Sequence, residues 1–404
     1  MYNFDETIDR RNSNAMNTDG FRSYIFHADD TMTFPYKDEE FIRMWVADME
    51  FATPDVIIDA MRRRLDRRIF GYTRIFGSDY YQAFSAWCQR RYGWSFPQEE
   101  LVMSNGIIPA LYELVDYICQ PDETVLFLTP SYAYFKYAAD FNHRPCVCSD
   151  LVDTDGYYTM DFDDLEQKAS DPKTTLLIFC NPHNPTGRVW RREELERLGS
   201  IVEKNNLWVI SDEIHCDLLR TGQTHIPLGK VLPDYKRLVT CMAPSKTFNM
   251  AGLMISNVLI RDAALRDTWL SRHYNFDNPL SVAAAQAAYE QGEPWLTELQ
   301  AYLDGNFAYT ADYLAQHLPQ AKFRVSEATY LAWVDLSAYF TPEEHLPLFF
   351  ANLAGVLLEG GNMFVRNSDG FIRLNLACPK ATVAEGLKRI CQAVNTKHTE
   401  KYLG

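Results

Sequence analysis

The chain reads Cys241-Met-Ala-Pro-Ser-Lys-Thr-Phe-Asn-Met-Ala-Gly252 directly after the apolar run Leu238-Val239-Thr240. A short apolar run is typical of a buried strand, so Lys246 stands just past a strand end. A lysine in that place is commonly a solvated charge, but a lysine amine also forms imines with carbonyl compounds. Which of the two applies depends on whether other chemically suited residues converge on the same place.

Short apolar runs alternate with helical patterns from about residue 54 to residue 260. The predicted strands are Thr124–Leu128, Pro145–Ser149, Thr174–Cys180, Leu207–Ser211, Leu238–Cys241 and Ile255–Ile260. The predicted helices are Pro54–Ile69, Asp79–Tyr92, Ile107–Cys119, Tyr132–Phe141 and Arg191–Asn205. Fully apolar strands that alternate with helices predict an α/β fold, in which a mostly parallel sheet is covered on both faces.

The pattern changes after Asp262, where helices dominate as far as His317. We expect the remaining elements to be strands at Lys322–Val325, Tyr330–Asp335 and Phe371–Leu376 and helices near Pro342–Ala354 and Thr382–Asn395. This order predicts a smaller α+β domain. The expected division is an N-terminal segment, residues 1–45, that packs on the small domain, a large domain, residues 46–288, and the small C-terminal domain, residues 289–404.

The composition excludes several classes of function. The net charge of -15 argues against nucleic acid as a partner, and the basic stretch Met61–Arg68 is expected to be the exposed face of a helix. The nine cysteines are odd in number and include no Cys-x-x-Cys pair, which indicates reduced thiols and no metal site. The sequence shows no apolar run of membrane-spanning length and no N-terminal signal peptide, so we expect a cytoplasmic protein.

Motifs for other common enzyme chemistries are absent from the sequence. It contains no G-x-G-x-x-G, no Walker A loop, no G-x-S-x-G and no HExxH. These absences argue against nicotinamide-dependent enzymes, ATP-binding enzymes, serine hydrolases and zinc proteases.

Polar residues follow four of the predicted strands. They are Thr129-Pro130-Ser131-Tyr132, Asn181-Pro182-His183-Asn184-Pro185-Thr186-Gly187, Asp212-Glu213-Ile214-His215 and Ser245-Lys246. In open α/β sheets, ligands bind beyond the carboxyl ends of the strands. A tyrosine, an asparagine, an aspartate and a lysine therefore share one rim of the predicted sheet.

These residue types suit a pyridine aldehyde that carries a phosphate. An aspartate can keep the ring nitrogen protonated, a tyrosine can stack on the ring and an asparagine can donate to its phenolic oxygen. The run Ser104-Asn105-Gly106-Ile107-Ile108 opens a predicted helix, whose first N–H groups can hold the phosphate. Each feature also has a structural explanation, since Asp212 can end a strand and residues 181–187 can form a plain turn. Their convergence favours the cofactor site.

At this point the chain resembles the fold-type I enzymes that use pyridoxal 5'-phosphate (PLP), the aspartate aminotransferase superfamily. The signatures are Asn-Pro-x-Asn-Pro-Thr-Gly at 181–187, Ser-Asp-Glu-Ile-His at 211–215 and Ser-Lys-Thr-Phe-Asn at 245–249. Within it, the chain is similar to the MalY/PatB group of cystathionine β-lyase-like C–S lyases. That similarity rests on Trp45-Val-Ala-Asp-Met-Glu-Phe51, Phe70-Gly-Tyr-Thr-Arg74, His215 and Gly370-Phe-Ile-Arg-Leu-Asn375.

The resemblance covers nearly the whole chain and implies an aspartate-aminotransferase-like fold. The large, PLP-binding domain is expected to hold a mostly parallel seven-stranded sheet between helices. By the same resemblance Lys246 forms the imine with PLP, Asp212 pairs with the ring nitrogen, Asn184 and His215 lie near the phenolic oxygen and Tyr132 stacks on the ring.

The resemblance also implies residues for the phosphate and the substrate. Ile107, Ile108 and Ser245 bind the phosphate. Tyr72 reaches the phosphate of the neighbouring subunit and takes part in catalysis there, in a homodimer with shared active sites. Arg373 grips the substrate α-carboxylate together with Asn184, since a planar guanidinium matches a carboxylate bidentately. Two positions depart from the family, because Ala243 stands where a hydroxyl residue is frequent and Met254 where aminotransferases often have arginine.

The activity implied is β-elimination from L-cystathionine or related cysteine S-conjugates, which yields thiol, pyruvate and ammonia. An aminotransferase of class I/II is the alternative, because both reactions begin by removing the Cα proton. A binding or regulatory protein that keeps the fold is a third reading, against which the intact set of Lys246, Asp212 and Arg373 argues.

Overall fold

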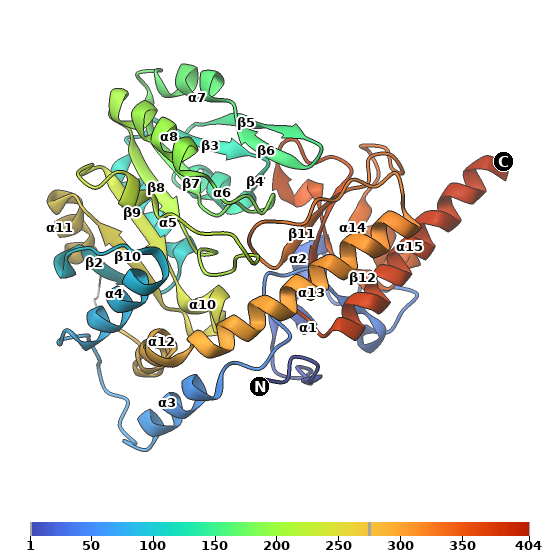
Figure 1. Cartoon of the computed structure of the whole chain (residues 1–404), viewed down its shortest axis with the longest axis horizontal. Coiled ribbons are helices and arrows are strands. Elements are labelled where there is room, and N and C mark those ends of the chain that lie inside the picture. Colours follow the sequence, from blue (N-terminus) through green and yellow to red (C-terminus); the bar gives the residue numbers. More distant parts are fainter. Residues whose placement is uncertain (1, 274–275, 404) are drawn as a thin grey trace.

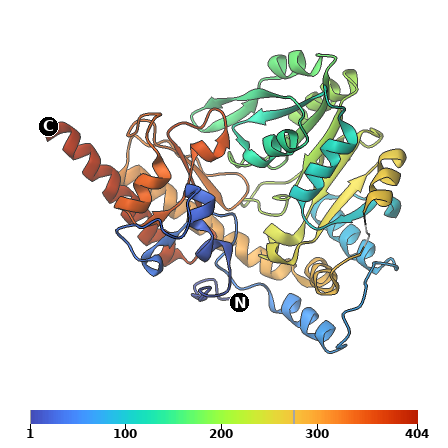
Figure 2. The same cartoon turned by 180° about the vertical axis from the view of Figure 1, so that it is seen from behind.

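The structure is a computed structural model that describes residues 2–273 and 276–403, and its two main sheets are a large one of eight strands and a small one of three (Figures 1 and 2). The large sheet has the strand order β2-β10-β9-β8-β7-β3-β5-β6. Its strands are β2 (Leu101–Ser104), β3 (Thr124–Thr129), β5 (Cys146–Thr154), β6 (Tyr157–Met160), β7 (Thr174–Cys180), β8 (Trp208–Asp212), β9 (Leu238–Met242) and β10 (Ser256–Ile260). The five strands β5, β3, β7, β8 and β9 run parallel, whereas β10, β2 and β6 join in antiparallel pairs.

Helices cover both faces of the large sheet because its central strands are apolar on both sides. Leu176 and Ile178 of β7 pack in one core, whereas Leu177 and Phe179 pack in another. The first core includes side chains of α5 (Ile107–Ile118), α6 (Ala133–Phe141) and α11 (Ala263–Arg272). The second includes side chains of α7 (Phe162–Ala169), α8 (Arg192–Lys204) and α9 (Leu228–Val231).

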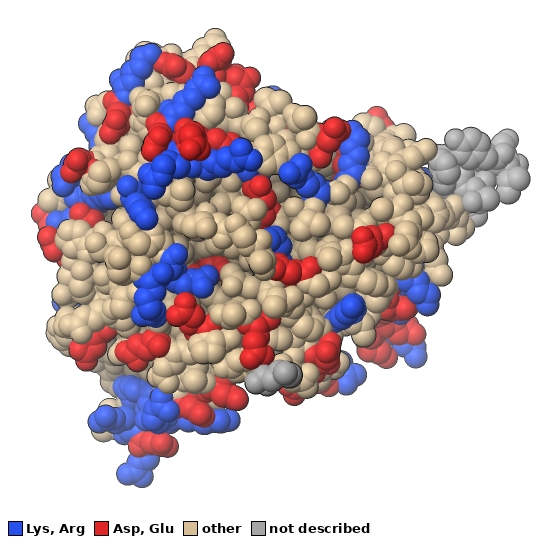
Figure 3. Space-filling model, viewed as in Figure 1, with Lys and Arg blue, Asp and Glu red and all other residues tan. Residues whose placement is uncertain are grey.

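A further layer of helices lies beside the β2 edge of the sheet. It consists of α3 (Asp55–Leu65), α4 (Asp79–Tyr92) and α12 (Pro279–Gln291), and α12 packs against both of the others. The arginines at 62, 63, 67 and 68 are exposed, as the sequence predicts, and form a basic group at the lower edge in Figure 3.

The small sheet is antiparallel and has the order β11-β15-β13. Its strands are β11 (Leu331–Asp335), β13 (Glu359–Gly360) and β15 (Phe371–Asn375), packed with α13 (Glu293–His317), α14 (Leu346–Leu353) and α15 (Lys380–Leu403). The 25-residue helix α13 runs from the large sheet to the small one (Figure 1). Alternation along β15 buries Ile372 and Leu374 in the core of the small sheet and directs Arg373 to the other face.

The N-terminal residues lie against the small sheet. The short helices α1 (Met16–Asp19) and α2 (Phe21–Phe26) come first, and β1 (Ile42–Arg43) then pairs in parallel with β12 (Val356–Leu357). Phe21, Ile25 and Trp45 share a core with Leu357. The predicted boundaries after residues 45 and 288 stay predictions.

The predicted α/β architecture is confirmed, with two differences in detail. The large sheet has an eighth strand, because β5 continues past the end of β3 and pairs there with the short β6. The prediction of a strand at Lys322–Val325 was wrong, since that stretch forms a single bridge, from Lys322 to Asp335. In the described part of the chain no helix is long and apolar enough to cross a membrane.

Candidate active site

A cavity of about 240 Å³ opens at the carboxyl ends of the parallel strands. Tyr132, Asn184, Asp212 and Lys246 all line it, each from the segment that follows a different strand of the row β3, β7, β8 and β9. The expectation that these four side chains share one rim is therefore met. Parallel strands achieve this because their carboxyl ends lie at one edge of the sheet.

Lys246 lies in the four-residue helix α10 (Pro244–Thr247), immediately after β9. Its Nζ donates a hydrogen bond of 2.5 Å to the carbonyl oxygen of Ala47. Burial lowers the pKa of Lys246, although the nearby Asp48 opposes this shift. The amine is thus held inside the cavity, and its neutral form is easier to reach than for an exposed lysine.

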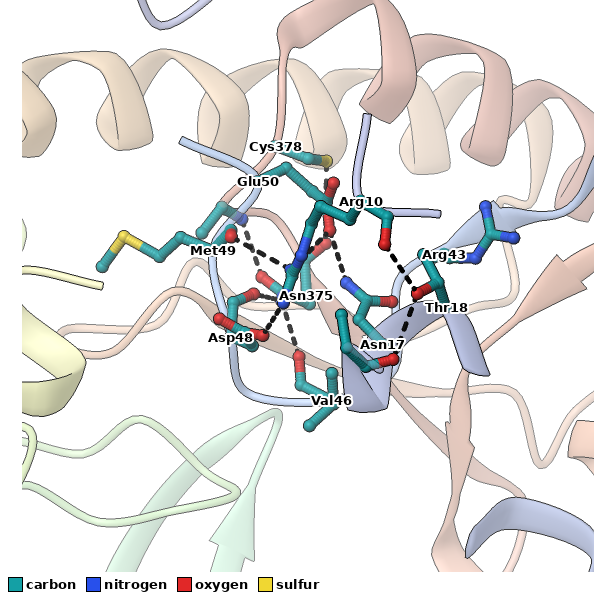
Figure 4. Close-up of polar contacts among 12 residues, drawn as sticks. Arg10, Asn17, Thr18, Arg43, Val46, Asp48, Met49, Glu50, Asn375 and Cys378 are labelled. Atoms are coloured by element: carbon teal, nitrogen blue, oxygen red, sulfur yellow. Dashed lines mark hydrogen bonds and ion pairs between the residues drawn. The ribbon is translucent and has the colours of Figure 1, made fainter. Parts of the chain in front are cut away.

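The segment that contacts Lys246 is itself fixed by side chains from both ends of the chain (Figure 4). Asn375 Nδ2 donates to the carbonyl oxygens of Val46 and Asp48 at 2.7 and 2.5 Å. Arg10 forms ion pairs with Asp48 and Glu50 at 2.5 and 3.2 Å. The segment Trp45–Phe51 is therefore fixed in place next to Lys246.

Asp212 is the last residue of β8 and is 6 % exposed. Burial raises the pKa of its carboxyl group to about 7. The backbone N–H of Ile214, which donates to Oδ1 at 3.2 Å, partly opposes this rise. A buried carboxylate of this kind is stabilised by a cation, and a protonated pyridine nitrogen supplies one.

His215 lies beside Asp212 on the cavity wall and is 3 % exposed. Burial, together with the charges of Lys246 and Arg373, lowers the pKa of its imidazole to about 3. Its Nδ1 is buried and has no hydrogen-bond partner among the described residues. A neutral ring with an unsatisfied nitrogen suits a polar group of a bound ligand.

The opposite end of the cavity is formed by the start of α5. Asn105, Gly106, Ile107, Ile108 and Ser245 line this end. Gly106 precedes the helix with a φ of 152°, a conformation that L side chains rarely adopt. The first N–H groups of a helix have no intrahelical acceptors and bind phosphate well.

Arg373 reaches the cavity from β15 of the small sheet and is 1 % exposed. Its Nη1 donates to Asn184 Oδ1 at 3.1 Å, and its Nη2 forms an ion pair with Glu359. Glu359 stands directly opposite Arg373 in the register of β13 and β15, so the sheet itself holds the pair. The guanidinium also lies 5.0 Å from the centre of the Phe364 ring.

The loop that carries Asn184 is held by its own backbone. Gly187 N donates to His183 O at 2.7 Å, and Gly187 O accepts from Ala328 N at 2.9 Å. Gly187 has a φ of 70°, and a Cβ there would lie 2.4 Å from Ser326 Cβ. The turn-forming composition of residues 181–187 therefore serves to fix Asn184 toward Arg373.

The family model described as aminotransferase class I and II matches residues 39–390. The chain belongs to this family. It is 40 % identical to cystathionine beta-lyase PatB of Bacillus subtilis over 357 residues, which cover 87 % of this chain and 92 % of PatB. It is 31 % identical to protein MalY of Escherichia coli over 355 residues, which cover 86 % and 90 % of the two chains.

Among solved structures, the chain is similar to the PLP-bound C-S lyase from Staphylococcus hominis. The two share 51 % sequence identity, the TM-score is 0.93 and the match covers 98 % of each chain. The resemblance predicted from the sequence, to the MalY/PatB group within the aspartate aminotransferase superfamily, is thereby confirmed.

The cavity of this family member fits PLP by its chemistry. Burial raises the pKa of the Asp212 carboxyl, which the positive charge of a protonated ring nitrogen would offset. His215 Nδ1 has no hydrogen-bond partner among the described residues, and the start of α5 offers N–H groups. Tyr132 and Lys246 complete the lining. Of the two departures from the family, Met254 also lines the cavity, whereas Ala243 is buried next to α10.

Tyr72 lies away from the cavity of its own chain. Its side chain is 92 % exposed and stacks on Phe276, with 4.9 Å between the ring centres. The neighbouring apolar side chains of Ile69, Phe70 and Phe76 are also exposed. The role of Tyr72 in a second subunit stays a prediction.

Sequence reasoning did not assign Glu359, Tyr24 or Ala47 to the site, yet all three line the cavity. Glu359 could have been suspected from the sequence, because this carboxylate directly follows the apolar run Val356–Leu358. Ala47 lies within the Trp45–Phe51 motif, which the sequence analysis used only for the resemblance. No local sequence pattern marks Tyr24 as a site residue, because the packing of the N-terminal segment on the small sheet brings it to the cavity.

Proposed function

We propose that the protein is a PLP-dependent C–S β-lyase that cleaves L-cystathionine or related cysteine S-conjugates to a thiol, pyruvate and ammonia. The observation that carries this proposal is the placement of Lys246, Asp212 and Arg373 in one cavity of a chain that is 40 % identical to a cystathionine beta-lyase. In this proposal Lys246 is the base, Asp212 is the partner of the ring nitrogen and Arg373 binds the substrate carboxylate.

PLP, when bound, supplies an aldehyde that forms imines with amines and a ring that takes up the electrons released from Cα. With PLP and substrate bound, Lys246 would be the base that accepts the Cα proton at Nζ. Its lowered pKa suits that role, because an efficient base has a pKa close to the working pH. The hydrogen bond to the carbonyl oxygen of Ala47 shows that Nζ already lies inside the cavity.

Arg373 and Asn184 bind the substrate α-carboxylate in the proposed mechanism. Arg373 Nε is buried and has no acceptor within the described residues, so the guanidinium has a donor to offer. Asn184 Oδ1 orients the guanidinium through the hydrogen bond to Nη1. With PLP bound, Asp212 would keep its ring nitrogen protonated, and His215 and Asn184 would hold its phenolic oxygen.

The proposal includes a homodimer in which Tyr72 reaches the phosphate of the neighbouring site. Its exposure and that of Ile69, Phe70 and Phe76 support a second subunit there. The large domain at residues 46–288 binds PLP in this arrangement. A cytoplasmic location is also proposed, since all nine cysteines are free.

The test is incubation of the PLP-loaded protein with L-cystathionine and no keto acid. Pyruvate and free thiol released over many turnovers support β-elimination. A stall after one turnover that a keto acid relieves would show an aminotransferase instead. Absence of a PLP absorbance band in the purified protein would contradict both enzymes.

A further inference from the structure

Arg10 binds a stretch of chain, residues 47–50, that also contacts Lys246. Its Nη2 donates to Asp48 Oδ2 at 2.5 Å, and its Nη1 donates to Glu50 Oε1 at 3.2 Å (Figure 4). The carbonyl oxygen of Ala47, in the same stretch, accepts from Lys246 Nζ at 2.5 Å. The guanidinium and the amine of the cavity therefore contact directly adjacent residues, Asp48 and Ala47.

The backbone of this stretch does not depend on Arg10 alone. Asn375 Nδ2 donates to the carbonyl oxygen of Asp48 at 2.5 Å. Asn249 Oδ1 accepts from Met49 N at 3.1 Å, and its Nδ2 donates to the carbonyl oxygen of Met49 at 3.0 Å. These amides hold the backbone when Arg10 is replaced, so the particular contribution of Arg10 is a positive charge at the Asp48 carboxylate.

The Asp48 carboxylate acts on two cations. It is paired with Arg10, and its negative charge is also the nearby charge that most strongly opposes the lowering of the pKa of Lys246 by burial. The other charged or titratable side chains that face Lys246 are Asp212, His215, Glu359 and Arg373. Those that also face Asp48 include Glu50 and Tyr330. All of these stay the same in the variants described below, so a difference between variants reports on Arg10 and Asp48.

The pair of Arg10 and Asp48 is partly withdrawn from water. Its two side chains are 22 % and 23 % exposed, whereas those of the neighbouring pair, Arg11 and Asp9, are 61 % and 59 % exposed. Water and salt screen partly buried charges less than exposed ones. The charge of Arg10 is therefore screened less than that of Arg11, which makes Arg11 a matched control.

We propose that Arg10 is a positioning residue of the active site: it holds and neutralises the Asp48 carboxylate, which would otherwise keep Lys246 in its charged form. A base must be neutral before it can accept a proton, so an unopposed carboxylate near the amine would slow the reaction. Arg10 does not line the cavity and acts only through Asp48. This inference rests on the proposed function, because that function makes Lys246 the base.

The test measures the pH at which the PLP absorbance of the loaded protein changes because the nitrogen of Lys246 loses its proton. In Arg10→Gln this midpoint is expected to rise by about one pH unit, because the negative charge of Asp48 is no longer offset. Arg11→Gln is the control and should keep the wild-type midpoint. An unchanged midpoint in Arg10→Gln would overturn the inference.

Two further variants separate a loss of charge from a loss of structure. Arg10→Lys keeps the positive charge, so its midpoint should lie closer to that of wild type than to that of Arg10→Gln. The double variant Arg10→Gln/Asp48→Asn removes both charges, so its midpoint should return to the wild-type value or fall below it. A double variant with a midpoint as high as that of Arg10→Gln would show a change of structure instead and would contradict the role of charge.

Labelling of the cofactor-free protein separates this inference from the proposed function. Acetic anhydride acylates neutral amines, so the pH dependence of labelling at Lys246, read by mass spectrometry, gives the pKa of its amine without PLP. A rise of this pKa in Arg10→Gln supports the inference whether or not L-cystathionine is cleaved, and without cleavage only the proposed function fails. Cleavage of L-cystathionine together with equal pKa values in Arg10→Gln and wild type would keep the proposed function and refute the inference.

Discussion

Arg373 and Asn184, 189 residues apart in the chain, meet through a hydrogen bond of 3.1 Å between a guanidinium nitrogen and an amide oxygen. Arg373 belongs to the small sheet and Asn184 to the loop after β7 of the large sheet. This corner of the cavity therefore exists only when the two sheets are packed together. Glu359, the other partner of Arg373, is held opposite it by the register of the small sheet.

Replacing Arg373 by methionine is expected to destabilise the fold as well as weaken substrate binding. The change leaves Glu359, which is 4 % exposed, without its cation, and this typically costs about 3–5 kcal/mol. Adding Glu359→Gln should recover more than half of that loss. Urea unfolding of wild type, the single variant and the double variant measures the free energy of unfolding. The control is Arg192→Met, which removes an exposed ion pair with Glu196 and should change that free energy by no more than about 1 kcal/mol. Equal stability of Arg373→Met and wild type would contradict the buried pair.

Lys246→Ala is expected to lower kcat on the order of 10³-fold or more, because the base that accepts the Cα proton is removed. The variant should also lack the absorbance band of the lysine imine. Lys136→Ala, at an exposed lysine paired with Asp140 on α6, is the control and should keep both the band and the rate. A Lys246→Ala protein that turns over at the wild-type rate would rule out the assigned base.

The cofactor-free protein is expected to gain stability at high pH from Asp212→Asn. The pKa of Asp212 is raised from 3.8 to about 7 in the folded chain, so the folded state binds the proton more tightly than the unfolded state. The stability that this group contributes is present below pH 4 and is lost as pH rises to about 7. The difference in unfolding free energy between variant and wild type should therefore grow between pH 4 and 7 and then level off. Asp122→Asn, at an exposed aspartate, should show no such trend, and a flat difference for Asp212→Asn would refute the shift.

Mixing two impaired variants tests whether Tyr72 acts across subunits. Tyr72→Ala is expected to reduce kcat/KM by about tenfold or more while leaving folding intact, because the side chain is 92 % exposed. In a mixed dimer of Tyr72→Ala and Lys246→Ala, one of the two sites has both native residues, so activity should return after refolding together. A mixture of Asp212→Asn and Lys246→Ala has no native site and serves as the control. Failure of the first mixture to regain activity would place Tyr72 outside the partner's site.

The local sequence was sufficient for six of the eight strands of the large sheet, all except β2 and β6, and for the four residues at the carboxyl ends of the parallel strands. Apolar runs such as Thr174–Cys180 must be buried on both faces, and parallel strands then bring Tyr132, Asn184, Asp212 and Lys246 to one edge. The sequence also predicted that α5 begins at Ile107, because Gly106 and the periodic apolar residues after it are typical of a helix N-terminus. These features depend on residues close to one another in the chain.

Only the tertiary structure decided which distant segments complete the site. The Lys246 amine donates to the carbonyl of Ala47, Glu359 pairs with Arg373, and Tyr24 lines the cavity. These contacts follow from the packing of the N-terminal segment and the small sheet against the large one, and no local pattern encodes such packing. The sequence by itself thus determined a lysine with the right neighbours at a strand end, whereas the folded chain determined which distant residues contact that lysine and close the cavity around it.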